Sequence, residues 1–244
     1  MERYSAIARS KSALRRCRVP GSPQLLVTDF AGTTLHDGGA VLAAYRATLT
    51  RFEIPFTDEE LHPWRGASKR AVFEHFAARL ESADAAGVAG QALALFEEQL
   101  REAYGSEPVE EIPGAEAMVR TLRAAGVRVA LTTGFPRGLT ELIVGRLGWD
   151  ELFDLVLTPE DVPTARPAPY MIYRAMMELG VYDVARVAVA GDTPLDLEAG
   201  SNARCGWFIG VLSGAHGIET LGVAPHTHLL PSVAGLPTLF GIEG

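Results

Sequence analysis

The chain has 244 residues, of which 48% are hydrophobic and 21% charged, and its formal net charge is −8. These values exclude collagen-like, disordered and disulfide-scaffold proteins, and they allow one large domain or two small ones. Residues 1–20 hold six basic residues and one acidic residue, so the rest of the chain is more acidic than the total. A nucleic-acid partner is therefore not expected, because phosphate backbones select basic surfaces.

The basic start of the chain, residues 1–23, is interpreted as a flexible leader. It lacks the apolar run of a secretory signal, and the sequence contains no run of roughly 20 apolar residues that would span a membrane. The whole chain has two cysteines, Cys17 and Cys205, which are too few and too far apart for a disulfide framework. We therefore expect a cytoplasmic protein that has no membrane partner.

The first predicted strand is Gln24–Phe30, an almost continuously apolar run of the kind that is buried on both faces. Three helical patterns follow it with no strand pattern between them: Ala40–Phe52, Lys69–Leu80 and Gly90–Tyr104. Between the first two, Thr57 and Glu60 have the spacing of a helix capping box. The chain thus places an all-helical insert directly after its first strand.

Beyond the insert, strand and helix patterns alternate. The predicted strands are Val127–Thr133, Phe153–Thr158, Arg186–Asp192 and Gly206–Leu212, and the predicted helices are Ala115–Ala125, Leu139–Leu147, Pro169–Leu179 and Leu195–Ala199. Gly126, Gly148 and Gly180 stand where three of these helices should end. The alternation indicates an α/β fold, in which residues 24–37 and 111–244 form a Rossmann-like parallel sheet core with helices on both faces and residues 38–110 form the all-α insert.

Polar side chains stand at the carboxyl ends of these strands, where parallel α/β sheets bind their ligands. They are Asp29, Thr132 with Thr133, Arg166, and Asp192 followed one helical turn later by Asp196. Carboxylates bind Mg²⁺, a guanidinium and a hydroxyl complement phosphate oxygens, and a carboxylate can accept a phosphoryl group. Each Asp taken alone is better explained as a turn or helix cap, as Asp192 is before Thr193 and Pro194. The joint pattern favours a phosphoryl-transfer site.

The order and spacing of these residues resemble the four motifs of the haloacid dehalogenase (HAD) superfamily. The motifs are Asp29-Phe-Ala-Gly-Thr33, Thr133, Arg166 and Gly191-Asp192-x-x-x-Asp196. The chain is most similar to the phosphonoacetaldehyde hydrolase (phosphonatase)-like group, because Ala31 replaces the second motif Asp, Arg166 replaces the usual Lys, and residues 158–167 look phosphonatase-like. The resemblance implies that the insert is a cap domain.

The resemblance also implies a role for each site residue. Asp29 is the nucleophile that becomes an aspartyl-phosphate, and Asp29, Asp192 and the carbonyl of Ala31 hold Mg²⁺ with Asp196 behind them. Asp196 belongs to the metal site and orients it, and Thr133 and Arg166 bind the phosphoryl oxygens. The remaining substrate contacts are Gly32, Thr33, Arg65, Gly66 and Gly134.

Ala31 is an informative departure from the related phosphatases, in which an Asp protonates the leaving alkoxide. Such general acid catalysis is typically worth about 10²–10⁴ in rate, and a methyl group cannot supply it. We therefore expect poor hydrolysis of simple phosphomonoesters. A carbon leaving group stabilised as an enamine would need no such acid.

Lys69 is the candidate that would provide the enamine. By resemblance it is the cap lysine that forms a Schiff base with an aldehyde substrate, and only Lys11 and Lys69 are lysines among the 22 basic residues. Anion binding would accept arginine, whereas an imine needs a primary amine. However, Val72, Phe135 and Gly39 stand where the family pattern has His, Tyr and Cys.

Three readings of the function therefore remain open at this point. The first is a Mg²⁺-dependent phosphonatase-like hydrolase that acts on a small phosphonate or phosphate metabolite. The second is a phosphate-ester phosphatase in which Lys69 and Arg65 are anion contacts. The third is a non-catalytic phosphometabolite-binding protein. By resemblance alone, the partner of the chain is a second copy in a homodimer.

Overall fold

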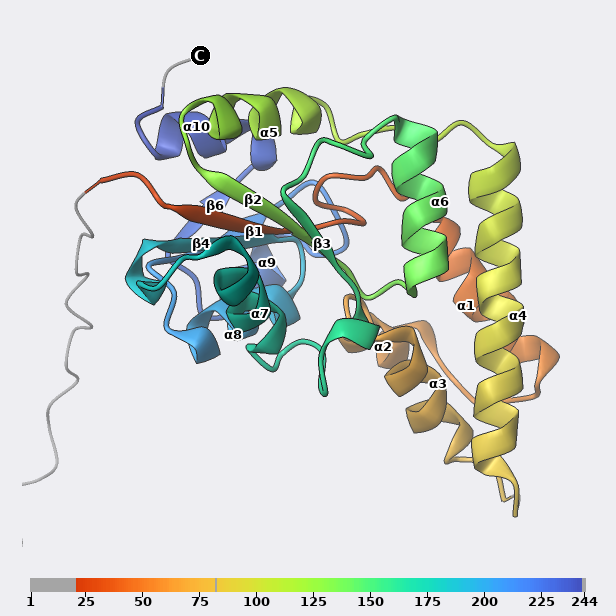
Figure 1. Cartoon of the computed structure of the whole chain (residues 1–244). Coiled ribbons are helices and arrows are strands. Elements are labelled where there is room, and N and C mark those ends of the chain that lie inside the picture. The colour runs from red at the N-terminus through yellow and green to blue at the C-terminus, as the bar shows by residue number, and fades with distance from the viewer. Residues whose placement is uncertain (1–20, 82, 243–244) are drawn as a thin grey trace, which may run out of the picture.

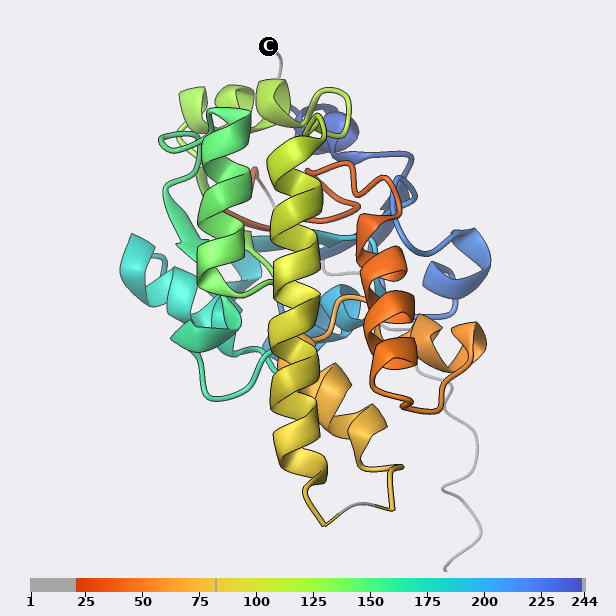
Figure 2. The same cartoon turned by 90° about the vertical axis from the view of Figure 1, so that its right-hand side faces the viewer.

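The computed structural model describes residues 21–81 and 83–242. Most of the predicted leader, including Cys17, lies outside these residues, whereas Cys205 is buried with a free thiol. The described residues form a sheet with helices on both faces and a helical group beside it (Figures 1 and 2). Within the same residues, no helix has both the length and the apolar character needed to cross a bilayer.

The sheet has six strands, all parallel, in the order β3-β2-β1-β4-β5-β6. In chain order they are β1 Leu25–Asp29, β2 Arg128–Thr132, β3 Leu155–Leu157, β4 Val187–Gly191, β5 Trp207–Val211 and β6 His228–Leu230. The α/β fold class is thus confirmed. The first five lie inside the five predicted runs, and β6 is an additional strand at the edge that periodicity did not reveal because it has only three residues.

Helices α5 (Ala115–Ala124) and α10 (Leu236–Leu239) cover one face of the sheet, and α7 (Tyr170–Leu179) and α8 (Pro194–Ala203) cover the other (Figure 1). Gly148 and Gly180 end α6 (Arg137–Leu147) and α7 in the left-handed conformation, as expected. Helix α8 is longer than the predicted Leu195–Ala199, because polar residues of its last turn, such as Asn202, interrupt the apolar pattern.

The helices between β1 and α5 are α1 (Ala40–Arg51), α2 (Asp58–Leu61), α3 (Lys69–Ala77) and α4 (Ala85–Ser106). They stand together beyond the carboxyl ends of the strands (Figure 1). The capping box of Thr57 and Glu60 starts α2. Helix α4 begins before the predicted Gly90, because the Asp84 side chain accepts a hydrogen bond from the Gly87 amide and caps an earlier turn.

One hydrophobic core runs from the sheet into this helical group. Phe30, at the end of β1, has its ring centre 6.4 Å from that of Phe135, which in turn contacts Tyr104 of α4. Within the group, the rings of Tyr45 and Phe96 lie 4.6 Å apart. Each fully buried side chain of this size contributes about 1.5–3 kcal/mol, so the helices are held to the sheet largely by packing.

Two backbone segments connect the helical group to the sheet, and they pair with each other. The amide of His36 donates to Glu110, the amide of Ile112 donates to Thr34, and Leu35 forms an antiparallel bridge with Glu111. We call residues 34–36 with 110–112 the linker ribbon. It starts only five residues after the nucleophile candidate Asp29.

Candidate active site

Three buried carboxylates meet at the carboxyl ends of β1 and β4, which are neighbours in the sheet. Asp29 is the last residue of β1, Asp192 follows β4, and Asp196 lies in the first turn of α8. One oxygen of each lies within 4.8 Å of the others. This is a donor set of hard oxygens, the kind that Mg²⁺ and Ca²⁺ prefer.

The charges of these carboxylates fit a cation between them. Burial, together with the nearby Asp196 and Asp192, raises the pKa of Asp29 to about 8, despite the adjacent Arg166. Burial and Asp196 likewise raise the pKa of Asp192 to about 6. A divalent cation would favour the ionised form of both groups, because an opposite charge offsets the desolvation that opposes ionisation.

Arg166 balances part of this charge through a single nitrogen. Its Nη1 donates to Asp29 Oδ1 at 2.6 Å and also to Asp196 Oδ1. Its Nε and Nη2 are buried and have no acceptor among the described residues. A buried donor without a partner costs roughly 1–3 kcal/mol, so these two groups are suited to the oxygens of an incoming anion.

Two hydrogen bonds, one to each carboxylate oxygen, hold the side chain of Asp192 in the carboxylate cluster. Thr33 Oγ1 donates to Asp192 Oδ1 at 2.9 Å, and the Ala215 amide donates to Oδ2 at 2.6 Å. A Cβ on Gly32 would lie 2.4 Å from Asp192 Oδ2, and one on Gly214 only 2.1 Å from it. Both positions therefore need glycine for close approach, in addition to the positive φ of Gly32.

At the start of α8, the helix cap and the candidate metal ligand are two different residues. Its N-cap is Thr193, whose amide and hydroxyl both donate to Asp196 Oδ2. Asp192 is therefore not the cap, contrary to the alternative that the sequence left open. Asp196 takes part in the cap with one oxygen and binds Arg166 with the other.

The two threonines at the end of β2 have different environments. Thr133 is buried beside the site, and its hydroxyl oxygen accepts a hydrogen bond from the Phe135 amide at 3.0 Å. Thr132 instead donates to the Thr28 carbonyl and belongs to the interior of the sheet. Only Thr133 is placed to contact a ligand.

A cavity of about 430 Å³ brings most of the candidate residues together. Candidate residues that line it are Asp29, Ala31, Gly32, Arg65, Gly66, Lys69, Thr133, Gly134, Arg166 and Asp192. Thr33 and Asp196 do not line it: Thr33 is hydrogen-bonded to Asp192, and Asp196 is bonded to Arg166 and Thr193. We call this the site cavity.

Lys69 reaches this cavity from the helical group. It is the first residue of α3, whose N-cap is Ser68, and its side chain is only about 5% exposed. Its Nζ lies 5.3 Å from the ring centre of Phe135 and 5.5 Å from that of Tyr45. Burial, reinforced by the charge of Arg166, lowers the pKa of Lys69 to about 8, although Asp29 acts in the opposite direction.

Arg65 lines the same cavity and faces Asp37, with Nη2 4.0 Å from Oδ2. The Asp37 carboxylate also accepts hydrogen bonds from the Tyr104 hydroxyl and the Val41 amide. Sequence reasoning missed Asp37, although it lies only four residues after the motif around Asp29. It also missed Ala215, which the rule of reading strand ends would have reached after β5.

The helical group and the sheet core touch closely around the site. A Cβ on Gly66 would lie 2.6 Å from Thr193 Oγ1, and a Cβ on Gly134 would lie 2.6 Å from the Ala67 carbonyl oxygen. Below them the rings of His62 and His216 pack with centres 4.3 Å apart. The site cavity is thus covered by the segment that leads into α3.

The three positions that depart from the phosphonatase pattern carry no titratable group in the structure either. Val72 is fully buried in α3, and Phe135 packs against Phe30 and Tyr104. Gly39 is the N-cap of α1, and a Cβ added to it would meet none of the described atoms within 4 Å. Any proton transfer near Lys69 must therefore use other groups.

The sequence is similar to those of known hydrolases. The family model for haloacid dehalogenase-like hydrolases matches residues 23–204. Phosphonoacetaldehyde hydrolase of Bacillus cereus strain B4264 is 37% identical over 107 residues, which cover 43% of this chain and only 39% of that protein. A second phosphonoacetaldehyde hydrolase from Bacillus cereus is 29% identical over 209 residues, 79% of this chain and 76% of that protein.

Solved structures show the same fold at low identity. A hydrolase from Pseudomonas syringae superposes with a TM-score of 0.76 and 19% identity, over 91% of this chain and all of that one.

Proposed function

Because the chain belongs to the haloacid dehalogenase-like hydrolase family, we propose that it transfers the phosphoryl group of a small organophosphonate to Asp29 and then to water. The substrate class is that of phosphonoacetaldehyde, a phosphonate with a carbonyl group next to the carbon bonded to phosphorus. That the chain is a hydrolase sets aside the reading as a non-catalytic binding protein.

The phosphoryl group would be bound by the free donors of the site. Arg166 offers Nε and Nη2, and the Thr133 hydroxyl lies at the same strand edge. Asp29, Asp192 and the Ala31 carbonyl are the groups that would hold Mg²⁺, with Asp196 positioning Arg166. The ion offsets the negative charges of nucleophile and substrate when it is bound.

The chemistry that this chain supplies has two parts. The neutral amine of Lys69 adds to the substrate carbonyl, and the adduct takes up one proton from the solvent and loses water to give a protonated imine. Asp29 then attacks phosphorus, the carbon–phosphorus bond breaks, and its electron pair moves into the imine to give an enamine. Water afterwards cleaves the aspartyl-phosphate, and protonation and hydrolysis of the enamine release the aldehyde and the lysine.

The state of Lys69 is the observation that carries this proposal. A lysine acts as a nucleophile only when it is neutral, and burial lowers the pKa of Lys69 to about 8. Its Nζ lies over the rings of Tyr45 and Phe135. It shares one cavity with Asp29, so carbonyl and phosphoryl groups of one small molecule would reach both. The helical group would then act as the cap that excludes bulk water.

Borohydride reduction tests the imine directly. Reduction in the presence of phosphonoacetaldehyde should leave a two-carbon adduct on Lys69, found by peptide mass spectrometry. Lys69→Arg should lose carbon–phosphorus cleavage altogether and show no adduct. The absence of an adduct, with Lys69→Arg still active on its best substrate, would contradict the proposal.

A phosphate-ester phosphatase is the second candidate, and the loss of titratable groups at Val72 and Phe135 favours it. In this case Lys69 and Arg65 would be anion contacts beside Arg166. A metabolite panel that measures Mg²⁺-dependent phosphate release separates the candidates, because the phosphatase would act on esters without any carbonyl group. Dimerisation through the helical group and a cytoplasmic location stay predictions.

A further inference from the structure

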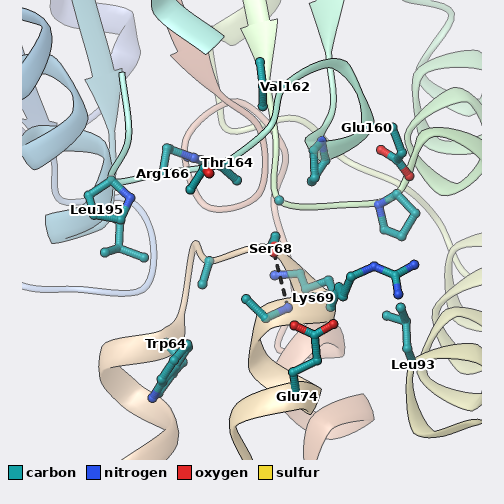
Figure 3. A pocket seen from close by; sticks show the side chains of 18 of the residues that line it. Trp64, Ser68, Lys69, Glu74, Leu93, Glu160, Val162, Thr164, Arg166 and Leu195 are labelled. Carbon is teal, nitrogen blue, oxygen red and sulfur yellow. Dashed lines mark hydrogen bonds between the residues drawn. The ribbon is translucent and has the colours of Figure 1, made fainter. Parts of the chain in front are cut away.

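A second and larger cavity is lined by Lys69 and Arg166, which also line the site cavity, and Figure 3 shows the lining of this second cavity. Its volume is about 740 Å³, and it lies between α3 and α4 on one side and residues 159–167 with Leu195 on the other. It shares Lys69, Gly134 and Arg166 with the site cavity. The two spaces therefore meet at the groups that the proposed reaction uses.

The wall of this cavity is mostly apolar. Trp64, Leu93, Val162 and Leu195 line it, and Figure 3 shows them on different sides of the same space. Prolines add rigid apolar surface at positions 63, 136, 159, 163 and 167. A site of this composition binds apolar groups, because removing them from water is favourable by roughly 25 cal/mol per Å².

The charged residues of the cavity decide which end groups it accepts. Beyond Lys69 and Arg166, the charged lining residues among those described are one arginine, Arg70, and three glutamates, Glu74, Glu97 and Glu160. Burial raises the pKa of Glu97, and Glu160 acts in the same direction, whereas Arg101 and Arg70 act in the opposite one. An anionic end group would lie beside these three glutamates, whereas an uncharged one would meet no such repulsion.

The site cavity alone is large enough for a two-carbon phosphonate. Small-molecule sites range from about 300 to 1,000 Å³, and the site cavity already falls in that range at about 430 Å³. The second cavity is thus not needed for phosphonoacetaldehyde. Its space is available to a larger substrate that passes Lys69.

We propose that the second cavity binds the organic part of the substrate, an uncharged apolar group of several carbons attached to the carbonyl carbon of a phosphonate. This inference rests on the proposed function for the placement of the phosphoryl group at Asp29 and Arg166. A carbonyl carbon beside Lys69 Nζ has the phosphonate-bearing carbon on one side and its other substituent on the other. With the phosphoryl group in the site cavity, that substituent enters the second cavity.

The test uses binding, so it does not depend on turnover. Ethyl-, butyl-, hexyl- and phenylphosphonate, which have no carbonyl group, are titrated into the wild-type protein with Mg²⁺ by calorimetry. Each buried CH₂ contributes at most about 0.8 kcal/mol, so affinity should rise up to about fourfold per CH₂ along the alkyl series. A 6-carboxyhexylphosphonate should bind more weakly than hexylphosphonate.

Ala71→Trp fills the cavity from α3 and should abolish the rise while leaving ethylphosphonate affinity within about twofold. Ala78→Trp is the matched control, because Ala78 is an exposed residue at the end of the same helix and lines neither cavity. Val162→Trp fills the same space from the core and replaces Ala71→Trp if that variant does not fold.

The inference is overturned if affinity does not rise with chain length in the wild type, if no alkylphosphonate binds, or if Ala78→Trp has the same effect as a cavity-filling variant. Failure of the proposed function looks different. In that case the chain-length dependence persists, whereas borohydride leaves no adduct on Lys69.

Discussion

Asp29 and Lys69 show at the scale of single residues how burial prepares a group for chemistry. Desolvation disfavours the charged form of both, so it raises the pKa of the carboxyl group and lowers that of the amine. The consequences differ, because a neutral lysine is reactive whereas a neutral aspartic acid is not. A cation at the carboxylate cluster would restore the reactive form of Asp29 without charging Lys69.

Asp29→Asn should abolish turnover and leave the protein folded. The amide keeps the shape of the side chain at the end of β1 but cannot form an aspartyl-phosphate, so phosphate release should fall by on the order of 10³-fold or more. Phosphate release and circular dichroism are measured on the same preparation. Asp150→Asn, at an exposed position, is the control. A folded Asp29→Asn variant with near wild-type activity would remove Asp29 from the reaction.

The rate of imine formation should depend on pH through Lys69. The pKa of about 8 means that the neutral fraction grows as the pH rises, so the borohydride trapping rate should rise about tenfold per pH unit below 8 and level off above it. Trapping is measured from pH 6 to 9 at constant ionic strength. A profile that is flat over this range, or that still rises steeply at pH 9, would contradict the assignment.

Ala31→Asp should change how the enzyme depends on its leaving group. If the missing acid limits ester hydrolysis, wild type should cleave activated aryl phosphates far faster than alkyl phosphates, and the new carboxyl group should narrow that ratio by up to about 10²–10⁴. Ala31→Asn has a similar size but no acid and should leave the ratio unchanged. Equal wild-type rates for both ester classes would mean that another residue donates the proton.

At the scale of elements, buried strands were the easiest feature to predict. Apolar runs bounded by polar ends identified the first five strands, since burial on both faces leaves little choice of residue in β1 or β4. The three-residue β6 and the early start of α4 at Ala85 were missed. An edge strand of three residues is too short to show a periodic pattern of apolar residues. An N-cap such as Asp84 can be recognised only once the helix that it starts is known.

The residues of the candidate site also divide into those that the sequence predicts and those that it does not. Residues that end strands or belong to ordered motifs, such as Asp29 and Asp192, could be found because the topology of a parallel sheet brings strand ends together. Tyr45 and Tyr104 could not, since they reach the site from α1 and α4 and act there through packing or a hydrogen bond to Asp37. The periodicity of the sequence predicts these helices but not the orientation in which they pack against the sheet.

Gly134→Ala should weaken both substrate use and stability. The added methyl group meets the backbone carbonyl oxygen of Ala67 at 2.6 Å, across the contact between the helical group and the core, so the backbone must shift and closure over the site should suffer. We expect kcat/KM to fall tenfold or more, with a Tm decrease of about 4 °C or more. Gly90→Ala, on an open face of α4, is the control and should keep full activity. Normal kinetics in Gly134→Ala would show that this contact is dispensable.

At the scale of the whole molecule, the carboxylate cluster should make stability depend on pH and Mg²⁺ together. The folded-state pKa values of Asp29 and Asp192 are raised, so without a metal the protein loses stability as the pH rises from about 4 to 8. Mg²⁺ at 100 times its Kd would return about 2.7 kcal/mol, or roughly 5–10 °C in Tm at this size.

Thermal unfolding at pH 5.5 and 8, with EDTA or with Mg²⁺, measures this effect without any substrate. The Mg²⁺ increment should be larger at pH 8, and Asp192→Asn should remove most of it. An increment that persists in Asp192→Asn would place the ion elsewhere.

The linker ribbon has a consequence for the order of events in a catalytic cycle. Leu35 pairs with Glu111 in the ribbon, and its carbonyl accepts from the Gly32 amide while its own amide donates to Phe30, the residue after Asp29. A rotation that separated the two segments of the ribbon would therefore also loosen the turn that carries Ala31. In the proposed reaction, reactivity would then be conditional on enclosure: Asp29 would be fully organised only while the helices cover it, so a phosphorylated Asp29 would have little occasion to meet a second acceptor in place of water.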